Sequence, residues 1–476
     1  MKTNKINAIK ENSNQAFFLN QKTEFKKFGF TDKEIKHIKR IIELEKNITT
    51  FHYGDFEKIV VIHKEESKTY KDKEKARKEG NTLCTYLHSN KIKEIQVQND
   101  NDSSILLAFI EGLMLTNYQF DKYLKDKKKI KTLVDKIDIF DKNIKASDLK
   151  TLAIKIEGVF LARDLVNEPF SGLNSVQLAE RIKELGKTAG FKTEVLEKKQ
   201  IESLNMGGLL AVNKASRIPP TFSILEWKPE NAKNKKPLIL VGKGIVFDTG
   251  GYNLKPGQYM NDMKSDMAGA AAVIGTIYTI SKLKLPFYVI GLVPSTDNLI
   301  GKDGYVTGDV ITMHNGMTVE ILNTDAEGRL ILADALSYAK KYNPEFVIDM
   351  ATLTGAAVRA IGTYASALMS TADKKCRKAL IKSGKSTYER LIEFPMWTEY
   401  GEELKSEIAD TTNLGSVNAG QITAAKFLEL FTDYQWAHLD IASTAYMEKA
   451  QSYWPKGGTG IPVRLLIDFI ENNFVK

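Results

Sequence analysis

The chain has 476 residues and a formal net charge of +9, with 43% hydrophobic and 27% charged residues. Its length exceeds that of one typical domain, and its composition excludes a disordered or fibrous chain. The two cysteines exclude a disulfide framework, and no apolar stretch approaches the roughly 20 residues that span a bilayer. The first residues are polar and rich in Lys and Asn, so we expect no signal peptide and a cytoplasmic location.

The excess positive charge lies in the first third of the chain. Residues 1–150 hold 31 Lys and Arg against 23 Asp and Glu, and the remainder is nearly balanced. A surface that binds nucleic acid carries such an excess, but here acidic residues are interleaved with the lysines and no nucleic-acid-binding motif accompanies them. A lysine-rich solvated surface is the favoured interpretation, and nucleic-acid binding is kept as an alternative side role.

Residues 1–147 are predicted to form a smaller N-terminal α/β domain. The apolar runs 58–63 and 94–97 indicate short buried strands, and residues 104–125 have the apolar spacing of a helix. Residues 148–163 repeat apolar side chains at the period of a long amphipathic helix. We therefore expect a linking helix over 148–168.

Residues 169–476 are predicted to form a larger C-terminal α/β catalytic domain. Segments 267–283 and 330–342 have helical spacing, and four apolar runs around them indicate buried strands. These runs are 237–241, 287–293, 346–350 and 436–441. Strands that alternate with helices predict a central, mostly parallel sheet flanked by helices, with ligands at the carboxyl ends of the strands.

Four segments between residues 242 and 330 combine acids, lysines and glycines, and none of them contains a histidine or a cysteine. They are Gly242–Gly251, Asn253–Pro256, Met263–Met267 and Asn323–Leu330, the last of which reads NTDAEGRL. Oxygen-rich sites suit hard or borderline divalent ions. The carboxylates are more than one ion needs, but they fit two ions that share bridging ligands, a common arrangement for hydrolysis. They belong to Asp248, Asp266, Asp325 and Glu327.

Spacing suggests how these groups meet. Asp325 and Glu327 stand two residues apart, so both carboxylates would face one site if the segment is extended. Arg329 would then share that direction, and its guanidinium could hold a small planar anion. Taken singly, each residue has a structural explanation as a loop carboxylate, a helix-start acid or a surface lysine. Among four acids, however, Lys243 or Lys255 could polarise a carbonyl or, once deprotonated, bind a metal ion.

The chain resembles the leucyl (cytosol) aminopeptidase family of dinuclear metallopeptidases. NTDAEGRL is the signature of that family, and family-like stretches recur through the second part of the chain, with a weaker match over 104–125. The stretches are Arg163–Pro169, Met206–Val212, Gly242–Pro256, Met263–Ala272, Asp309–Ile311, Asp349–Gly355, Ala419–Phe427 and Trp436–Ala442. The resemblance implies a metal-dependent aminopeptidase that removes Leu/Met-type and other apolar N-terminal residues from short peptides. A narrow-specificity Cys-Gly dipeptidase is an alternative, as is an aminopeptidase that also regulates by binding nucleic acid.

The resemblance also implies a role for each site residue. Lys255 would polarise the scissile carbonyl, and Arg329 would hold a bicarbonate that acts as general base on a water bridging the two ions. The expected ions are Mn or Zn, with Co and Mg possible. The ligands of the tighter ion would be Lys243, Asp248, Asp266 and Glu327. The ligands of the more exchangeable ion would be Asp248, Asp325 and Glu327, of which Asp248 and Glu327 bridge the pair.

Three further expectations concern specificity, one histidine and assembly. His438 lies in an apolar run and is interpreted as a packed or hydrogen-bonded core histidine, not a metal ligand. Because family members are hexamers whose active sites face an interior cavity, we expect a homohexamer that acts on short peptides. Four small or apolar residues match family positions that line the pocket for the first side chain: Met263, Thr352, Gly355 and Ala442.

Overall fold

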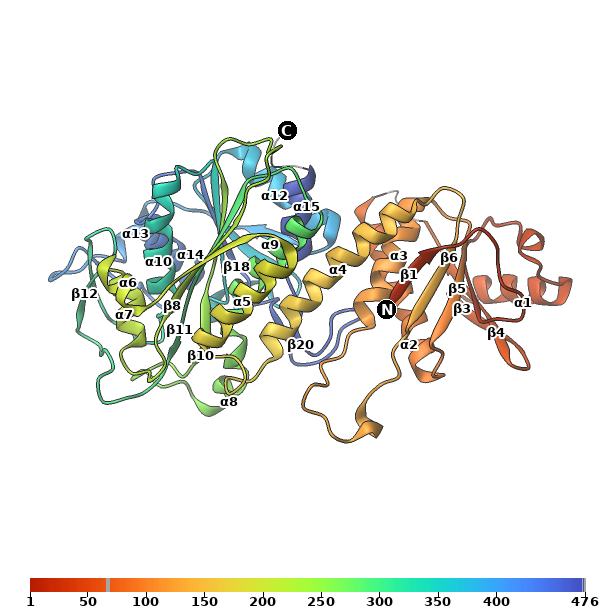
Figure 1. Ribbon diagram of the computed structural model, residues 1–476, viewed down its shortest axis with the longest axis horizontal. Helices are drawn as coiled ribbons and strands as arrows, with labels where there is room; N and C mark the ends of the chain where they lie inside the picture. Colours follow the sequence, from red (N-terminus) through yellow and green to blue (C-terminus); the bar gives the residue numbers. More distant parts are fainter. Residues whose placement is uncertain (66–68, 473, 475–476) are drawn as a thin grey trace. The chain divides into compact units, whose positions relative to one another are not determined.

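The computed structural model describes residues 1–65, 69–472 and 474, which form two compact units (Figure 1). The first unit comprises residues 1–156 with 449–456, and the second comprises residues 157–448 with 457–476. Helix α4 (Ala146–Asn167) contains the boundary between them. The segment 449–456 belongs to the first unit, where Tyr453 OH donates to Glu74 Oε2 at 2.7 Å. No helix in the described parts is long and apolar enough to cross a membrane.

The first unit is built on a six-stranded sheet with the order β1-β6-β5-β2-β4-β3. Neighbouring strands are parallel, except that β3 runs antiparallel to β4. The strands predicted at 58–63 and 94–97 are confirmed as β4 and β5. The bounds are β1 (Lys2–Lys5), β2 (Gln15–Asn20), β3 (Ile48–Tyr53), β4 (Phe56–His63), β5 (Glu94–Asn99) and β6 (Lys136–Phe140).

Two helices of this unit, α2 (Tyr70–Ser89) and α3 (Ser103–Thr116), pack at glycine contacts; α1 (Asp32–Glu43) precedes β3. A Cβ atom on Gly80 would lie 2.0 Å from Phe109 O, so only glycine permits this approach. Helix α3 ends at Thr116, and the prediction that it continues to residue 125 is wrong. The reason is Asn117, whose amide accepts from Val134 N at 2.8 Å and donates to Val134 O at 2.9 Å, which turns the chain away.

The second unit is built on a nine-stranded sheet with the order β16-β15-β18-β14-β9-β11-β8-β7, and β10 pairs with β11. The central strands β18, β14, β9 and β11 are parallel, whereas β8, β7 and β15 introduce antiparallel pairs. The predicted mostly parallel central sheet is confirmed. The bounds are β7 (Lys192–Leu196), β8 (Thr221–Trp227), β9 (Leu238–Gly242), β10 (Gly244–Asp248), β11 (Val289–Asn298), β14 (Phe346–Ala351), β15 (Ser366–Ser370), β16 (Leu391–Glu393) and β18 (Trp436–Asp440).

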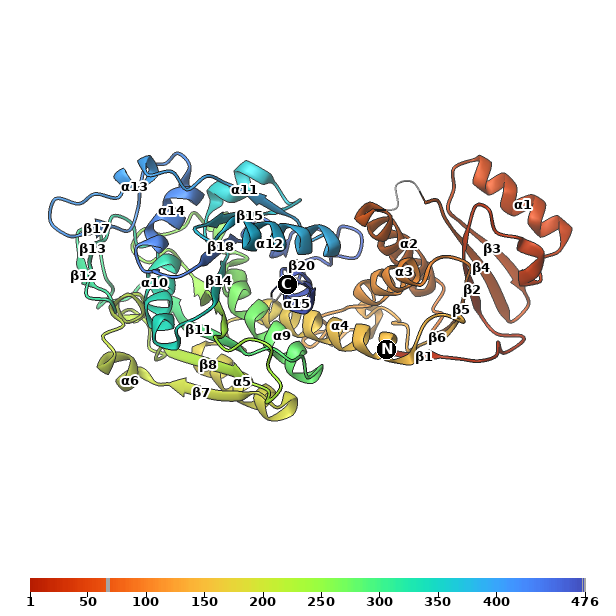
Figure 2. The ribbon, with the colours of Figure 1, turned by 90° about the horizontal axis from the view of Figure 1, so that it is seen from above.

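Helices cover both faces of this sheet (Figure 2). On one face, α9 (Ala268–Lys282) packs against β9, β11 and β14, and α5 (Ser175–Ala189) packs beside it. On the other, α7 (Gly207–Asn213) and α10 (Gly328–Ala339) contribute to a buried apolar cluster with alternate residues of the strands, such as Ile239 and Val241. Both faces of the central strands are therefore covered, which explains their continuous apolar runs.

The remaining elements of the second unit are short or peripheral. The helices are α6 (Lys198–Ser203), α8 (Gly257–Met260), η3 (Met263–Met267), η4 (Lys340–Tyr342), α11 (Gly355–Ile361), α12 (Lys374–Thr387), α13 (Glu399–Glu402), α14 (Gly420–Glu429) and α15 (Val463–Asn472). The small strands are β12 (Val310–Thr312), β13 (Thr318–Glu320), β17 (Thr411–Thr412), β19 (Tyr446–Met447) and β20 (Gly457–Gly458).

Candidate metal centre

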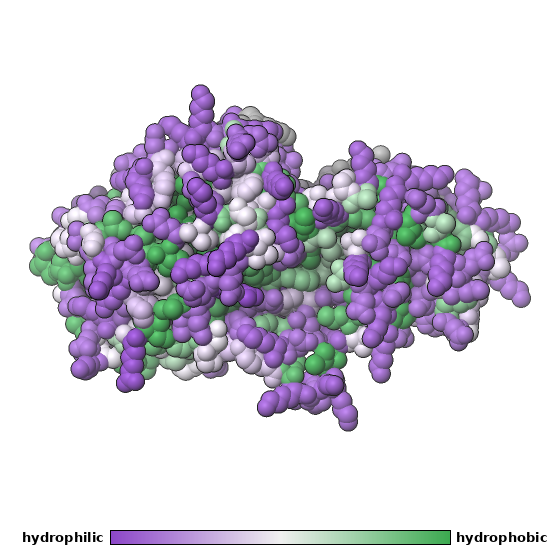
Figure 3. Space-filling model, in the orientation of Figure 1, coloured by the Kyte–Doolittle hydropathy of each residue, from purple (hydrophilic) through white to green (hydrophobic). Residues whose placement is uncertain are grey.

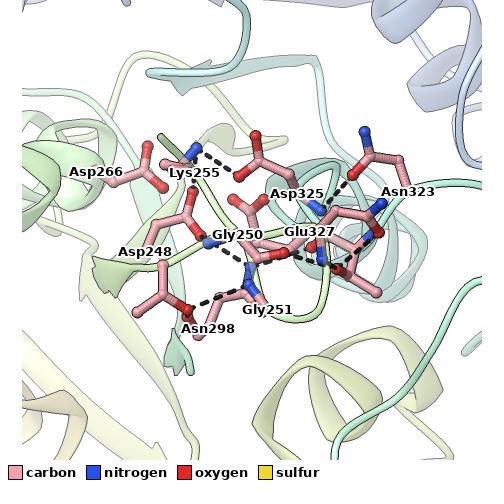
Figure 4. A network of polar contacts seen from close by, with 12 residues as sticks. Asp248, Gly250, Gly251, Lys255, Asp266, Asn298, Asn323, Asp325 and Glu327 are labelled. Atoms are coloured by element: carbon pink, nitrogen blue, oxygen red, sulfur yellow. Dashed lines mark hydrogen bonds and ion pairs between the residues drawn. The ribbon is translucent and has the colours of Figure 1, made fainter. Parts of the chain in front are cut away.

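The acids and lysines singled out in the sequence come together at the carboxyl ends of the central strands. Figure 4 shows the four acids with Lys255. Lys243 follows β9, and Asp248 ends β10. Asp266 lies in η3, and Glu327 immediately precedes α10. This is the edge of a parallel sheet where ligands bind in α/β folds.

Lys243 lies between two carboxylates at the buried end of the cluster. Its Nζ is 2.7 Å from Asp266 Oδ2 and 2.8 Å from Glu327 Oε1. A Cβ atom on Gly328 would lie 2.5 Å from Cε of the lysine, so the glycine after Glu327 makes room for this side chain. The glycine of the octapeptide therefore has a packing role in the site.

Lys255 lies between the other two carboxylates, as Figure 4 shows. Its Nζ is 2.9 Å from Asp248 Oδ2 and 2.5 Å from Asp325 Oδ1. A turn through Gly250, at φ 86°, returns the chain so that Lys255 N donates to Thr249 O at 2.9 Å. Glycine adopts this left-handed conformation without strain.

The octapeptide reaches the site through a turn, so the extended segment assumed from the sequence is wrong. Asp325 lies in the turn and Glu327 immediately precedes the helix. The carboxylates nevertheless converge: single ligand atoms of Asp248, Asp325 and Glu327 lie within 4.8 Å of one another. The condition under which Arg329 would share that direction, an extended segment, is therefore not met, because Arg329 lies in α10. Arg329 Nη1 instead donates to Asn413 O at 2.8 Å.

The charges in the cluster alter one another's protonation. Burial raises the pKa of Asp325 to about 7, and the nearby Asp248 and Glu327 add to the shift. Burial also raises the pKa of Asp248 and Asp266. For Glu327, burial acts in the same direction, but attraction to Lys243 and Lys255 outweighs it and the pKa falls below its ordinary value.

The two lysines show the reverse balance. Burial lowers the pKa of Lys243, but attraction to Asp266, Glu327 and Asp248 outweighs burial, so the pKa is raised. The same balance raises the pKa of Lys255. Without a metal ion, both lysines are therefore ammonium groups held by carboxylates.

The donor set fits divalent cations. The four acids outnumber the two ammonium groups, so the site carries excess negative charge when all four acids are ionised. The oxygens Asp266 Oδ2, Asp325 Oδ1 and Glu327 Oε1 are buried and have no well-aligned hydrogen bond among the described residues. Each of these oxygens lies within 2.8 Å of a lysine ammonium nitrogen. Since a lysine nitrogen binds metal only after losing its proton, an ion at Lys243 would compete with that proton.

Asn298 is a site residue that the sequence reasoning missed. Its Nδ2 donates to Asp248 Oδ1 at 2.8 Å and to Thr324 O at 3.1 Å, so it joins the turn of the octapeptide to the end of β10. Asn298 is fully buried, as are its β11 neighbours Thr296 and Asp297. A run of polar residues at the carboxyl end of an apolar strand was the available signal.

The arginine of the octapeptide is buried beside the cluster. Burial lowers the pKa of Arg329 to about 10, against the attraction of Glu327 and Asp440, so the guanidinium stays charged at neutral pH. Its Nε has no hydrogen-bond partner among the described residues. Arg329 therefore retains a buried donor with which to bind an anion.

The four residues predicted for a substrate pocket lie after strands or at the first residue of short helices in the second unit. Thr352 and Gly355 follow β14, Ala442 follows β18, and Met263 begins η3. Thr352 Oγ1 donates to Asp266 Oδ1 at 2.7 Å. This threonine is therefore tied directly to a predicted metal ligand.

His438 is a core residue, as its interpretation from the sequence predicts. It is fully buried in β18, and its Nδ1 lies 2.5 Å from Asp349 Oδ1. Trp436 Nε1 donates to the other oxygen of Asp349 at 2.6 Å. The pair stabilises the interior of the sheet below the site.

An oxygen-rich cluster at the carboxyl edge of a covered parallel sheet is the kind of site that metal-dependent hydrolases use. Residues 160–467 match the cytosol aminopeptidase family, catalytic domain, and the chain belongs to this family. The protein is therefore a metal-dependent aminopeptidase, and the resemblance inferred from the sequence is confirmed.

Curated relatives carry the name of this family, and a solved structure has a similar fold. A probable cytosol aminopeptidase of Syntrophotalea carbinolica is 47% identical over 373 residues, which cover 76% of this chain and 74% of that protein. One from Chlorobaculum tepidum is 48% identical over 380 residues, covering 76% and 74%. The structure of the bottromycin maturation enzyme BotP in complex with Mn is similar with a TM-score of 0.84 and 28% identity, covering 96% of this chain and 99% of that one.

Proposed function

We propose that the cluster binds two divalent metal ions and that the protein removes N-terminal amino acids from short peptides. The observation that carries this proposal is the convergence of the Asp248, Asp325 and Glu327 carboxylates, with Asp266 joined to Glu327 through Lys243. Bound ions would polarise the scissile carbonyl and lower the pKa of a water molecule between them. Mn or Zn is proposed, and the Mn complex of BotP supports the former. The tighter ion would be held by Lys243, Asp248, Asp266 and Glu327, and the exchangeable ion by Asp248, Asp325 and Glu327.

The depth of the side chains supports this division. The side chains of Lys243 and Asp266 are 4% and 6% exposed, whereas those of Lys255 and Asp325 are 15% and 31% exposed. An ion at the buried end exchanges slowly with solvent, and one beside Asp325 exchanges faster. Substrate would approach from the side of Lys255 and Asp325.

Lys255 is proposed to act on the carbonyl oxygen of the substrate. Its pKa is raised, because attraction to the surrounding carboxylates outweighs burial, so it remains a cation at neutral pH. A fixed ammonium group stabilises an oxygen on which negative charge develops more than it stabilises the neutral carbonyl. This residue would therefore accelerate the reaction more than it strengthens substrate binding.

Arg329 is proposed to hold bicarbonate as the general base. Its guanidinium is buried and charged, and its Nε has no hydrogen-bond partner among the described residues. A planar anion can accept hydrogen bonds from such a group. The anion would accept a proton from the attacking water.

Met263, Thr352, Gly355 and Ala442 are proposed to contact the first side chain of the substrate. Gly355 is exposed at the start of α11 and presents no side chain that would narrow the space. Small and apolar lining residues suit a Leu/Met-type side chain. Comparing leucyl, methionyl and other aminoacyl amides with Cys-Gly would separate this specificity from that of a narrow dipeptidase.

Metal analysis tests the central proposal. Protein saturated with Mn or Zn should hold two ions per chain and hydrolyse leucyl amides. Removing the exchangeable ion with a chelator should abolish activity, and adding it back should restore activity. Full activity with one ion per chain would contradict the dinuclear site.

We further propose a cytoplasmic homohexamer. Both cysteines are free, and large apolar side chains of the second unit are exposed, including Trp397, Ile408 and Val417. The hydrophilic face in Figure 3 is interrupted by apolar patches. Light scattering should give about six times the 53.4 kDa chain mass, and a fully active monomer would contradict the hexamer.

A further inference from the structure

The N-terminal unit has a cavity of its own, of about 470 Å³, outside residues 160–467 that match the catalytic family. It lies at the carboxyl ends of β2, β4 and β5. Its volume is in the range of small-molecule sites. The lining residues are Asn20, Gln21, Lys22, His63, Lys64, Glu65, Asp100, Asn101, Asp102 and Ile105.

The position of the cavity is the one where doubly wound sheets bind ligands. Strand β2 lies between β4 and β5, and the chain leaves β4 on one side and returns as β5 on the other. Where successive connections diverge in this way, a crevice forms at the carboxyl ends of the strands. Hydrogen bonds fix the lining there: Asn101 Nδ2 donates to Phe18 O and Asn20 Nδ2 donates to Asp100 O, both at 2.9 Å.

A buried histidine with an unpartnered ring nitrogen is one of the residues that line this cavity. His63 ends β4, and its Nδ1 lies 2.7 Å from Glu79 Oε2, with both side chains 2% exposed. His63 Nε2 is buried and has no hydrogen-bond partner among the described residues. Burying a polar atom without a partner costs free energy unless a ligand or water satisfies it. Because Glu79 occupies Nδ1, a ligand would meet Nε2.

The rim of the cavity carries charges of both signs. Lys22 and Lys64 are exposed there, together with Glu65, Asp100 and Asp102. A simple anion would be repelled by the acids, and a simple cation by the lysines.

A phosphate group and a metal ion fit this cavity less well. The N-terminus of α3 is already capped, since Asp102 Oδ1 accepts from Ser104 N at 2.8 Å, so it does not offer a free phosphate site. Among the described residues, the acids and histidine of this cavity do not approach closely enough to form a metal site.

We propose that this cavity binds a small zwitterion, a free α-amino acid or a dipeptide. The carboxylate would lie toward the lysines, the ammonium group toward the rim acids, and one polar group would reach His63 Nε2. The identification of the ligand rests on the proposed aminopeptidase function, which releases such molecules. The N-terminal unit would thus bind the products of the catalytic unit.

Equilibrium dialysis of radiolabelled L-leucine against the full-length, metal-loaded protein tests the proposal. The double variant Lys64→Gln/Asp100→Asn should bind one leucine per chain fewer than the wild type, or bind it at least tenfold more weakly, with unchanged hydrolysis of leucyl amides. The control variant is Lys26→Gln/Asp32→Asn, which removes an exposed ion pair of the same unit outside the cavity and should bind as the wild type does.

The variant His63→Gln provides a second test by the same leucine dialysis, and circular dichroism verifies that it is folded. This variant should also weaken the binding of that one leucine per chain. Equal leucine binding by the wild type and the rim variant would overturn the proposal. If hydrolysis is absent but the difference in bound leucine is present, the site stands and the proposed source of its ligand fails.

Discussion

Each of the two units places polar side chains at the carboxyl edge of its own parallel sheet. The charges of these side chains differ strongly between the two units. In the catalytic unit, four carboxylates, of which only that of Asp325 is partly exposed, surround two lysines. In the N-terminal unit, one histidine–glutamate pair lies below a rim of mixed charge. The topology determines where a ligand binds, and the side chains determine which ligand it is. The first set suits metal ions, whereas the second suits a small molecule of both charges.

A second comparison lies within the catalytic unit, between the carboxylates proposed to bind metal and one carboxylate whose oxygens already accept backbone hydrogen bonds. Asp334 is fully buried in α10, and its oxygens accept from Leu209 N and His314 N, both at 2.9 Å. It therefore serves the packing of the fold, whereas Glu327 and Asp266 contact lysine ammonium groups. Substitution of Glu327 or Asp266 should therefore change metal binding, whereas substitution of Asp334 should change the stability of the fold.

The largest effect is expected from Glu327→Ala or Asp266→Ala. Each change removes a proposed metal ligand, so kcat/KM should fall by at least about 1,000-fold, equivalent to about 4 kcal/mol of transition-state stabilisation. Metal analysis should show fewer bound ions, and circular dichroism should show an intact fold. Asp334→Asn is the control and should bind metal as the wild type does. Wild-type turnover in either alanine variant would remove that residue from the ligand set.

Lys255 and Lys243 should differ in what their loss changes. Lys255→Ala should lower kcat by about 100-fold to 1,000-fold, because its contact strengthens in the transition state, and should leave the metal content unchanged. Lys243→Ala should instead lower the metal content. Paired kinetics and metal analysis would measure both. If Lys255→Ala also loses metal, its assigned role is wrong.

Arg329→Ala should have a smaller effect, about tenfold to 100-fold on kcat, as expected for a group that holds a general base. Activity should recover in part when bicarbonate is added, because the anion needs no covalent link to the protein. Lys255→Ala, assayed in the same bicarbonate series, should not recover. Equal responses of the two variants would refute a specific role for the anion at Arg329.

The smallest effect concerns pH and the stability of Asp334→Asn. Burial raises the pKa of Asp334 to about 7, despite its backbone hydrogen bonds. An unfolded aspartate titrates near pH 4, at about 3.9. The folded state therefore binds this proton more tightly, and the contribution of Asp334 to stability is largest below about pH 4 and is lost as the pH rises through about 7.

Urea unfolding of metal-free protein at several pH values would measure this contribution. The difference in unfolding free energy between the wild type and Asp334→Asn should shrink as the pH rises from about 4 to about 7. A difference that does not vary with pH would show that the carboxyl group titrates normally in the folded state.

The sequence alone determined the class of fold and the composition of the site. Apolar runs predicted the central strands, since strands covered on both faces need apolar side chains throughout. The octapeptide and its three companion segments identified the acids, lysines and arginine, because these residue types are uncommon together among glycines. The ends of helices and strands were harder to predict from the sequence. Helix α3 stops before Asn117 because this residue forms hydrogen bonds with Val134, which is distant in sequence.

Only the tertiary structure decided how the site is assembled. The turn before α10 directs Asp325 and Glu327 to one point but turns Arg329 toward Asn413, which spacing in an extended segment did not predict. Asn298 and the His63 cavity were likewise found only in three dimensions. The physical reason is that periodicity records burial along one element, whereas charge balance and free hydrogen-bonding groups depend on elements that meet from distant parts of the chain.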